Sequence, residues 1–183
     1  MVFRIARALE CQLDSDTATL LYLTLVTDTG NFRFSNATAA AFDAAAATVR
    51  AGARPEQVSQ WLFESQPLTA LRLQGEMLHS LELHHGGRIA TVLLSAEMFA
   101  RANASPADTE GLIDIPRSIA GVDAVGLLRE VGLDRHKVSL RSRGTTNVES
   151  IARSHGGGGH HNAAGFTTVG TATDLRAMIV AAL

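Results

Sequence analysis

The sequence predicts an α/β protein with a helical first half and a second half that forms a mixed β-sheet flanked by helices. Up to about residue 80, apolar residues recur at helical spacing, and beyond it they form short runs typical of strands. Glycine, proline and asparagine separate these runs. Hydrophobic residues make up 46% of the 183 residues, enough for the core of one domain or of two small ones.

In the first half we expect short helices that begin at capping residues or at proline. The expected helices cover residues 3–11, 16–25, 38–52, 55–63 and 68–83. The first contains Cys11, and Asp14, Ser15 or Asp16 can cap the second. Gly52 ends the third and Pro55 opens the fourth. A domain connection is expected near residues 65–67.

In the second half, strands replace helices as the dominant pattern. A glycine turn at residues 86–87 joins strands at 81–83 and 89–94. Further strands are expected at 122–130, 137–141 and 164–169, and helices at 95–102, 106–119, 147–154 and 174–183. This alternation predicts one mixed sheet with helices packed on it.

Composition and charge exclude several classes of protein. A net charge of −2 disfavours a broad surface that coats nucleic acid, so any such contact should be local and directed at an end. Cys11 is the only cysteine, which excludes an internal disulfide and fits a reducing compartment. No run resembles a signal peptide or a membrane span, so a cytoplasmic protein without a membrane partner is expected.

The glycine run at residues 156–159, followed by two histidines, is the segment most suggestive of binding. Each glycine costs roughly 0.5–1 kcal/mol relative to alanine, so the run needs a compensating role. Successive backbone N–H groups of such a turn can form a nest for an anion, which makes Gly157, Gly158, Gly159, His160 and His161 candidate phosphate ligands. A flexible linker or a plain turn is the alternative.

Other ligands fit the glycine run poorly. The spacing does not match a dinucleotide fingerprint, and no lysine follows as in a P-loop. A zinc site is disfavoured because the sequence has one cysteine and no companion pair at ligand spacing.

Three further side chains lie at the ends of expected elements. Asp28 follows an apolar element and precedes Thr29 and Gly30. An aspartate at such a position either binds a ligand or is an ordinary turn residue that accepts hydrogen bonds from backbone N–H groups. Arg117 and Arg141 end their elements, and a guanidinium suits bidentate phosphate contact. For both arginines an ordinary surface position is the alternative.

The segments 28–35, 110–119, 138–142 and 156–165 together resemble the DHH/DHHA1 phosphoesterases, over the entire chain and in the family's order. The resemblance implies a C-terminal part of a DHH domain at residues 1–66, a connecting helix at 67–80 and a DHHA1 substrate-binding domain at 81–183. It is strongest for the members that hydrolyse short oligoribonucleotides and 3′-phosphoadenosine 5′-phosphate (PAP).

The resemblance also implies roles for individual residues. It implies that Asp28 is a ligand of one of two Mn²⁺ ions. It assigns substrate binding to Arg117, Arg141, Ser142, Gly157, Gly158, Gly159, His160 and His161. The implied chemistry is two-metal hydrolysis, in which a metal-bridging hydroxide attacks phosphorus in line. The implied substrates are short oligoribonucleotides or a nucleoside bisphosphate, and a homodimer through the DHH part fits the same family.

The sequence departs from the family at two points. The remaining metal-binding motifs, including an Asp-His-His triplet, are missing, so we expect the chain alone to be inactive and to be the C-terminal part of a larger enzyme. His161 stands where many relatives have arginine, which should weaken the hold on phosphate. Two alternatives remain, a non-catalytic nucleotide-binding DHHA1 module and a DHH-type exopolyphosphatase or cyclic-dinucleotide phosphodiesterase.

Overall fold

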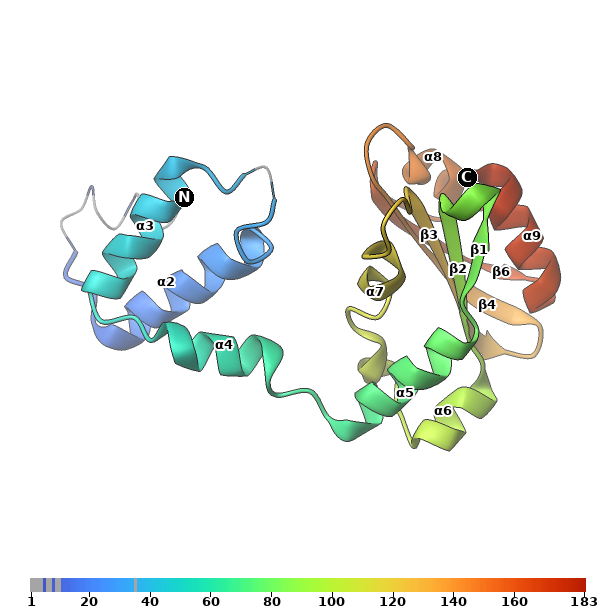
Figure 1. Ribbon diagram of the computed structural model, residues 1–183, viewed down its shortest axis with the longest axis horizontal. Coiled ribbons are helices and arrows are strands. Elements are labelled where there is room, and N and C mark those ends of the chain that lie inside the picture. The colour runs from blue at the N-terminus through green and yellow to red at the C-terminus, as the bar shows by residue number, and fades with distance from the viewer. Residues whose placement is uncertain (1–4, 6–7, 9–10, 35) are drawn as a thin grey trace. The chain divides into compact units, whose positions relative to one another are not determined.

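The computed structural model describes residues 5, 8, 11–34 and 36–183. The chain divides into two compact units, residues 1–66 and 67–183, of which the second contains the sheet (Figure 1). In the described part of the chain, no helix combines the length and the apolar character needed to cross a bilayer.

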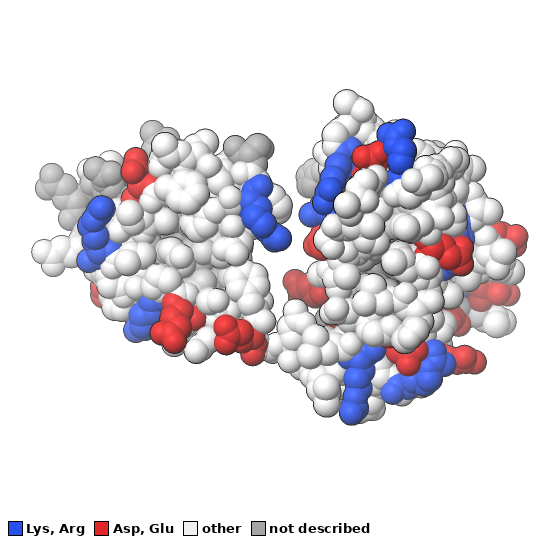
Figure 2. Space-filling view, in the orientation of Figure 1, with Lys and Arg blue, Asp and Glu red and all other residues white. Residues whose placement is uncertain are grey.

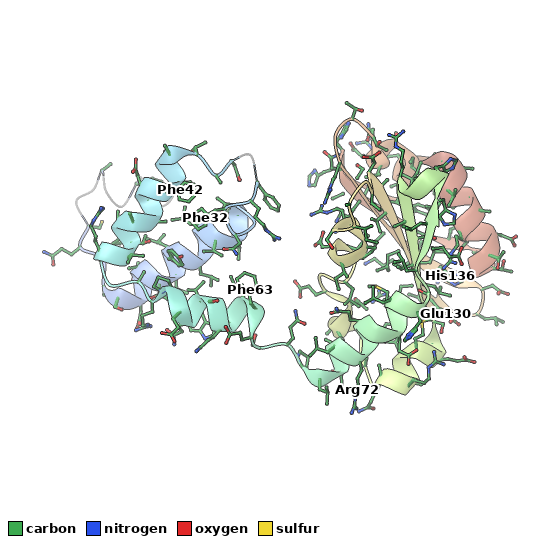
Figure 3. All side chains as sticks on the ribbon, viewed as in Figure 1. Phe32, Phe42, Phe63, Arg72, Glu130 and His136 are labelled. Atoms are coloured by element: carbon green, nitrogen blue, oxygen red, sulfur yellow. The ribbon has the colours of Figure 1, made fainter. Side chains whose placement is uncertain are left out.

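The first unit is built from the helices α2 (Ser15–Asp28), α3 (Ala39–Arg50) and α4 (Pro55–Phe63), and α2 packs against both of the others. Asp14 caps α2, because its carboxylate accepts a hydrogen bond from the Thr17 N–H at 2.7 Å. The buried side chains described in this unit are mostly small: Ala18, Thr19, Val26, Thr29, Ala44, Ala45, Thr48, Ala53 and Val58. The rings of Phe32 and Phe42 stack with their centroids 4.9 Å apart (Figure 3).

Two large apolar side chains of α4 are largely uncovered in this unit, since Trp61 is 46% exposed and Phe63 is 51% exposed. The helix expected over residues 3–11 falls mostly outside the described residues. Cys11 is described, and it lies exposed before α2 rather than on a helix.

The second unit contains a six-stranded sheet in the order β1-β2-β3-β4-β6-β5. The strands are β1 (Glu82–His84), β2 (Ile89–Leu94), β3 (Ala124–Gly132), β4 (Arg135–Ser142), β5 (Gly158–His160) and β6 (Ala163–Val169). β2 and β3 run parallel, and the other neighbouring strands run antiparallel. The predicted mixed sheet is therefore confirmed.

Helices lie on both faces of this sheet, and α7 and α9 are on opposite sides of it (Figure 1). The helices are α5 (Leu68–His79), α6 (Ala96–Ala102), α7 (Asp114–Arg117), α8 (Val148–Ser154) and α9 (Ala172–Ala182). One core contains Leu73 and Met77 of α5 together with Val125 and Leu127 of β3. The opposite core contains Leu128, Val138, Leu140, Val148, Ala152, Phe166 and Ile179. The segment expected to be a connecting helix thus belongs to the second unit's core.

Two predicted elements of the second unit are wrong. The helix expected over 106–119 is a short 3₁₀ helix, η2 (Pro106–Thr109), followed by a turn and then α7. Gly111 separates the two with a left-handed φ of 75°, which an α-helix does not accommodate. The glycine run, expected to be a loop, contains the strand β5.

Within the second unit, the half of the sheet formed by β6 and β5 has no helix on the α7 side. On that side α5 and α7 pack against β2, α7 also packs against β3 and β4, and no helix of residues 67–183 makes more than marginal contact with β6 or β5. On the other side α8 covers β4, β5 and β6. The α7-side face of β4, β6 and β5, called the open face below, carries small residues, among them Ser139, Ala163, Gly165 and Gly158.

Candidate phosphate-binding site

The open face brings Arg141 and His160 together. In the sheet register, Arg141 of β4 pairs with Ala163 of β6, and Ala163 pairs with His160 of β5. Paired residues on neighbouring strands project to the same face. Arg141 and His160 therefore stand on the open face with a single methyl group between them.

Arg141 has no acidic partner. Its guanidinium donates to the carbonyl of the adjacent Leu140 at 3.0 Å, and no carboxylate of the described residues lies within 4.0 Å of it. The side chain is half-buried. A partly desolvated cation without a counter-ion is a favourable place for a ligand anion.

Arg117 is in a different electrostatic situation. It lies at the end of α7, where its guanidinium pairs with Asp114 at 3.1 Å. Its backbone carbonyl accepts a hydrogen bond from the Arg143 guanidinium at 2.7 Å. The Asp114 carboxylate already compensates much of the charge of Arg117, so Arg141 is the stronger candidate for binding phosphate.

The first two glycines of the run end α8 and do not form the expected anion nest. The Gly157 N–H donates to the Ala152 carbonyl at 2.8 Å and the Gly156 N–H to the Arg153 carbonyl at 3.0 Å. With the left-handed Gly156, these bonds make a Schellman helix end. Both N–H groups are thereby used within the protein.

The last three glycines of the run differ in whether they would tolerate a side chain. A Cβ on Gly157 would lie 2.2 Å from the Gly165 carbonyl oxygen, and one on Gly159 would lie 2.4 Å from the Ala163 carbonyl oxygen. These two glycines let β5 pack closely on β6. A Cβ on Gly158 meets nothing within 4 Å, and Gly158 has no left-handed φ. Neither packing nor backbone conformation requires glycine there, which leaves close approach of a ligand as a reason.

Ser142 is buried and points away from the open face, because it alternates with Arg141 along β4. Its hydroxyl donates to the Thr146 carbonyl at 2.7 Å and accepts from the Asn162 side-chain amide at 3.0 Å. The direct substrate contact expected of this hydroxyl is therefore not available in this structure. Ser142 instead fixes the loop after β4 to the turn between β5 and β6.

That turn carries His161 and Asn162. The His161 carbonyl accepts a hydrogen bond from the Val148 N–H at 2.9 Å, which ties the turn to the first residue of α8, and the His161 side chain is exposed. Asn162 joins the turn to Ser142 and to the Gly144 carbonyl, at 3.3 Å. Sequence reasoning missed Asn162, although a polar residue between the histidines and an apolar strand was a usable signal.

Asp28, the candidate metal ligand, belongs to the first unit. It is the last residue of α2, and its exposed carboxylate makes no hydrogen bond or ion pair with any described residue. An acid at a helix C-terminus is electrostatically unfavourable. Thr29 and Gly30 shape the turn that follows, since the Gly30 N–H donates to the Thr27 carbonyl and a Cβ on Gly30 would lie 2.3 Å from the Phe34 ring.

The described residues contain no cluster of three or more histidine, cysteine, aspartate or glutamate side chains that would hold a metal ion. Asp28 is a single carboxylate, and a pair of Mn²⁺ ions needs several ligands.

Basic and acidic side chains are interspersed over the second unit on the face drawn in Figure 2. On that face the basic side chains form no continuous patch.

Comparison with known proteins agrees with this description. Residues 88–182 match the DHHA1 domain family. The chain is 33% identical over 162 residues to the bifunctional oligoribonuclease and PAP phosphatase NrnA of Thermus thermophilus, covering 87% of this chain and 47% of that protein. It is 26% identical over 154 residues to the NrnA of Bacillus subtilis, covering 84% of this chain and 48% of that protein.

A solved structure resembles both units. The crystal structure of an exopolyphosphatase-related protein from Bacteroides fragilis matches with a TM-score of 0.90 at 25% identity, covering 99% of this chain and 54% of that chain. The chain therefore spans about half the length of the relatives that it matches.

Proposed function

Because the chain belongs to the DHH/DHHA1 phosphoesterase family and is NrnA-like, we propose that it supplies the substrate-binding part of a phosphoesterase acting on short oligoribonucleotides and PAP. One observation carries the proposal. Arg141 is half-buried, lacks a carboxylate partner among the described residues, and shares a register row with His160 on the open face.

The open face suits a nucleotide phosphate in both charge and shape. The Arg141 guanidinium offers a planar fork of donors to two phosphate oxygens. His160 adds a ring N–H from β5, which is separated from β4 by β6. The small side chains of Ala163, Gly165 and Gly158 leave room for a sugar or a base beside that phosphate. Because strands hold both Arg141 and His160 in place, little conformational entropy of the backbone is lost when phosphate binds.

The proposal concerns recognition of the substrate and includes no hydrolytic step. The family resemblance implies two Mn²⁺ ions, but the described residues do not fit them, because Asp28 stands without a second ligand. Phosphate binding at Arg141 should accordingly be independent of Mn²⁺ in this chain.

Isothermal calorimetry of the 183-residue chain with PAP and with a diribonucleotide tests the proposal, with and without Mn²⁺. We expect binding that does not need the metal, and about 10-fold or greater weakening in Arg141→Gln and in His160→Ala. The matched control is Arg153→Gln, which removes an exposed arginine of α8 paired with Glu149 at 2.7 Å. Equal affinities in all variants would overturn the assignment of the site.

The name of the Bacteroides relative makes polyphosphate the second candidate ligand. Tripolyphosphate is therefore included as a competitor in the same experiment. If it bound more tightly than PAP and the diribonucleotide, the site would recognise a polyphosphate rather than a nucleotide.

A further inference from the structure

A second basic group lies at the other end of the open face. Arg129 of β3 and Lys137 of β4 are direct register partners, so two like charges stand opposite each other on one face of the sheet. Like charges placed directly opposite each other on neighbouring strands are destabilising. No carboxylate of the described residues lies within 4.0 Å of either side chain. The position therefore has an unbalanced positive charge that an anion would relieve.

This pair faces the same side as Arg141. Side chains alternate along β4, so Lys137, Ser139 and Arg141 project to one face. Lys137 and Arg141 are four positions apart along the strand, a distance of about 13 Å. Ser139 and its register partner Gly165 lie between them, so no bulky side chain separates the two basic positions.

A pocket of about 640 Å³ adjoins the pair on the same side. Its walls include Phe99, Pro106 and Leu133, and Arg129 is part of its lining. Phe99 packs on the same core as Leu127, which places the pocket on the open-face side of β3. Leu133, in the turn between β3 and β4, is 94% exposed and is therefore accessible to a ligand in the pocket.

The one acidic residue that lines the pocket is already engaged. The Glu130 carboxylate accepts a hydrogen bond from the Ala96 N–H at 2.9 Å, at the start of α6. Glu130 and its register partner His136 lie at the end of the sheet near α6 (Figure 3). The negative charge of Glu130 is therefore directed to the helix N-terminus, where it is favourable.

We propose that Lys137 and Arg129 form a second phosphate position and that the adjoining pocket takes the base beside it, so that the open face binds a single RNA strand along β4. This inference rests on the proposed function, in which Arg141 and His160 hold the first phosphate. A stacked strand rises about 3.4 Å per nucleotide, and a stretched one more, so 13 Å spans roughly two to four nucleotides. The second position distinguishes an oligoribonucleotide from PAP, whose two phosphates belong to one nucleoside.

Lys137 is the only lysine in the sequence, so its amine can be probed selectively. Reductive methylation of the full chain, followed by peptide mass mapping, separates Lys137 from the terminal amine. A pentaribonucleotide should slow modification of Lys137 at least 5-fold, whereas saturating PAP should leave it unchanged. Equal modification rates with and without the bound pentaribonucleotide would overturn the second position.

Affinity measurements give an independent test. Lys137→Gln should weaken binding of a pentaribonucleotide about 3- to 10-fold and reduce the slope of log affinity against log salt by about 0.7, the value for one phosphate contact on a single strand. Binding of PAP should not change. Lys137→Arg should restore both properties, and Leu133→Asn, at a fully exposed side chain, should weaken the pentaribonucleotide alone. Arg153→Gln serves again as the control.

The outcomes separate this inference from the proposed function. If PAP binds through Arg141 but the pentaribonucleotide gains nothing from Lys137, the second position is wrong and the first stands. If neither ligand binds, both are wrong. If Lys137→Gln weakens PAP and pentaribonucleotide equally, Lys137 acts as general positive charge and not as a position for a second phosphate.

Discussion

Arg141 and His160 are 19 positions apart in the sequence, yet they share one register row of the sheet, with only Ala163 between them. The rows of a hydrogen-bonded sheet fix such neighbours more rigidly than a loop would. A phosphate bound there would contact a guanidinium and an imidazole without rearrangement of the backbone.

Arg141→Gln should reduce PAP affinity about 10- to 100-fold, since hydrogen bonds to charged groups contribute about 1.5–3 kcal/mol. The stability of the protein should hardly change, because the only hydrogen bond that this side chain makes among the described residues is to the neighbouring Leu140 carbonyl. Arg117→Gln should cost less affinity, as Asp114 already compensates its charge. Calorimetry with PAP, together with thermal unfolding, measures both effects. A larger loss for Arg117→Gln would mean that the phosphate lies at α7.

The glycine run allows packing to be separated from binding. Gly157→Ala should lower the free energy of unfolding by about 1–3 kcal/mol, because its methyl group would overlap the Gly165 carbonyl. Gly158→Ala should change stability by less than about 0.5 kcal/mol and yet weaken PAP binding, because its methyl group would occupy the ligand's space. Unaltered PAP affinity of Gly158→Ala would show that no ligand approaches β5 there.

Local sequence signals predicted most of the fold. Apolar spacing located α2, α3, α4 and the long strands, and Asp14 was among the expected caps of α2. The strand β5 was missed because Gly158 and Gly159 carry no side-chain alternation, so only pairing with β6 defines it. The helix expected over 106–119 failed at Gly111, whose left-handed φ cannot be read from a helical apolar pattern.

The site is less accessible to sequence reasoning than the fold. Arg141 and Arg117 look alike as arginines at element ends, and only the structure shows that Asp114 pairs with one of them. The family resemblance assigned substrate binding to both Arg141 and Ser142, but strand alternation puts the two side chains on opposite faces. The row of Arg141 and His160 depends on the register of three strands, which is a long-range property.

Ser142→Ala should destabilise the second unit by about 1–2 kcal/mol, because a buried hydroxyl that both donates and accepts is lost. We also expect weaker PAP binding, through a looser turn at His161 and Asn162. A double-mutant cycle with Asn162→Ala, evaluated by calorimetric unfolding, should show non-additive effects. Strict additivity would mean that the bond between the two side chains does not contribute to the turn.

The stability of the second unit should depend on pH through Asp108. Hydrogen bonds from the Ser105 N–H, at 2.7 Å, and from the Ser105 and Thr69 hydroxyls, at 3.0 Å each, keep the pKa of the Asp108 carboxyl below its ordinary value. A lowered pKa in the folded state stabilises the protein above the unfolded value, about 3.9, and that contribution is lost as the pH falls through the folded pKa.

Asp108→Asn should therefore flatten the decline of stability between about pH 5 and pH 2. Scanning calorimetry at several pH values, on the wild type and the variant, measures the slope. Glu110→Gln is a suitable control, because its exposed side chain makes no hydrogen bond or ion pair with a described residue. Identical slopes for the wild type and Asp108→Asn would place the acid sensitivity elsewhere, for example at the ion pair of Glu76 with Arg101.

His161→Arg should strengthen phosphate binding. The substitution keeps the backbone carbonyl that holds the Val148 N–H, and the exposed side chain leaves space for a longer one. A guanidinium is always charged and offers a planar fork of donors that fits phosphate. We expect PAP affinity at pH 7.5 to rise about 3- to 10-fold and to become more sensitive to salt. His79→Arg, at the exposed end of α5, adds the same charge away from the site. Because a general electrostatic effect would raise both affinities equally, only a gain confined to His161→Arg places the bound phosphate beside the turn between β5 and β6.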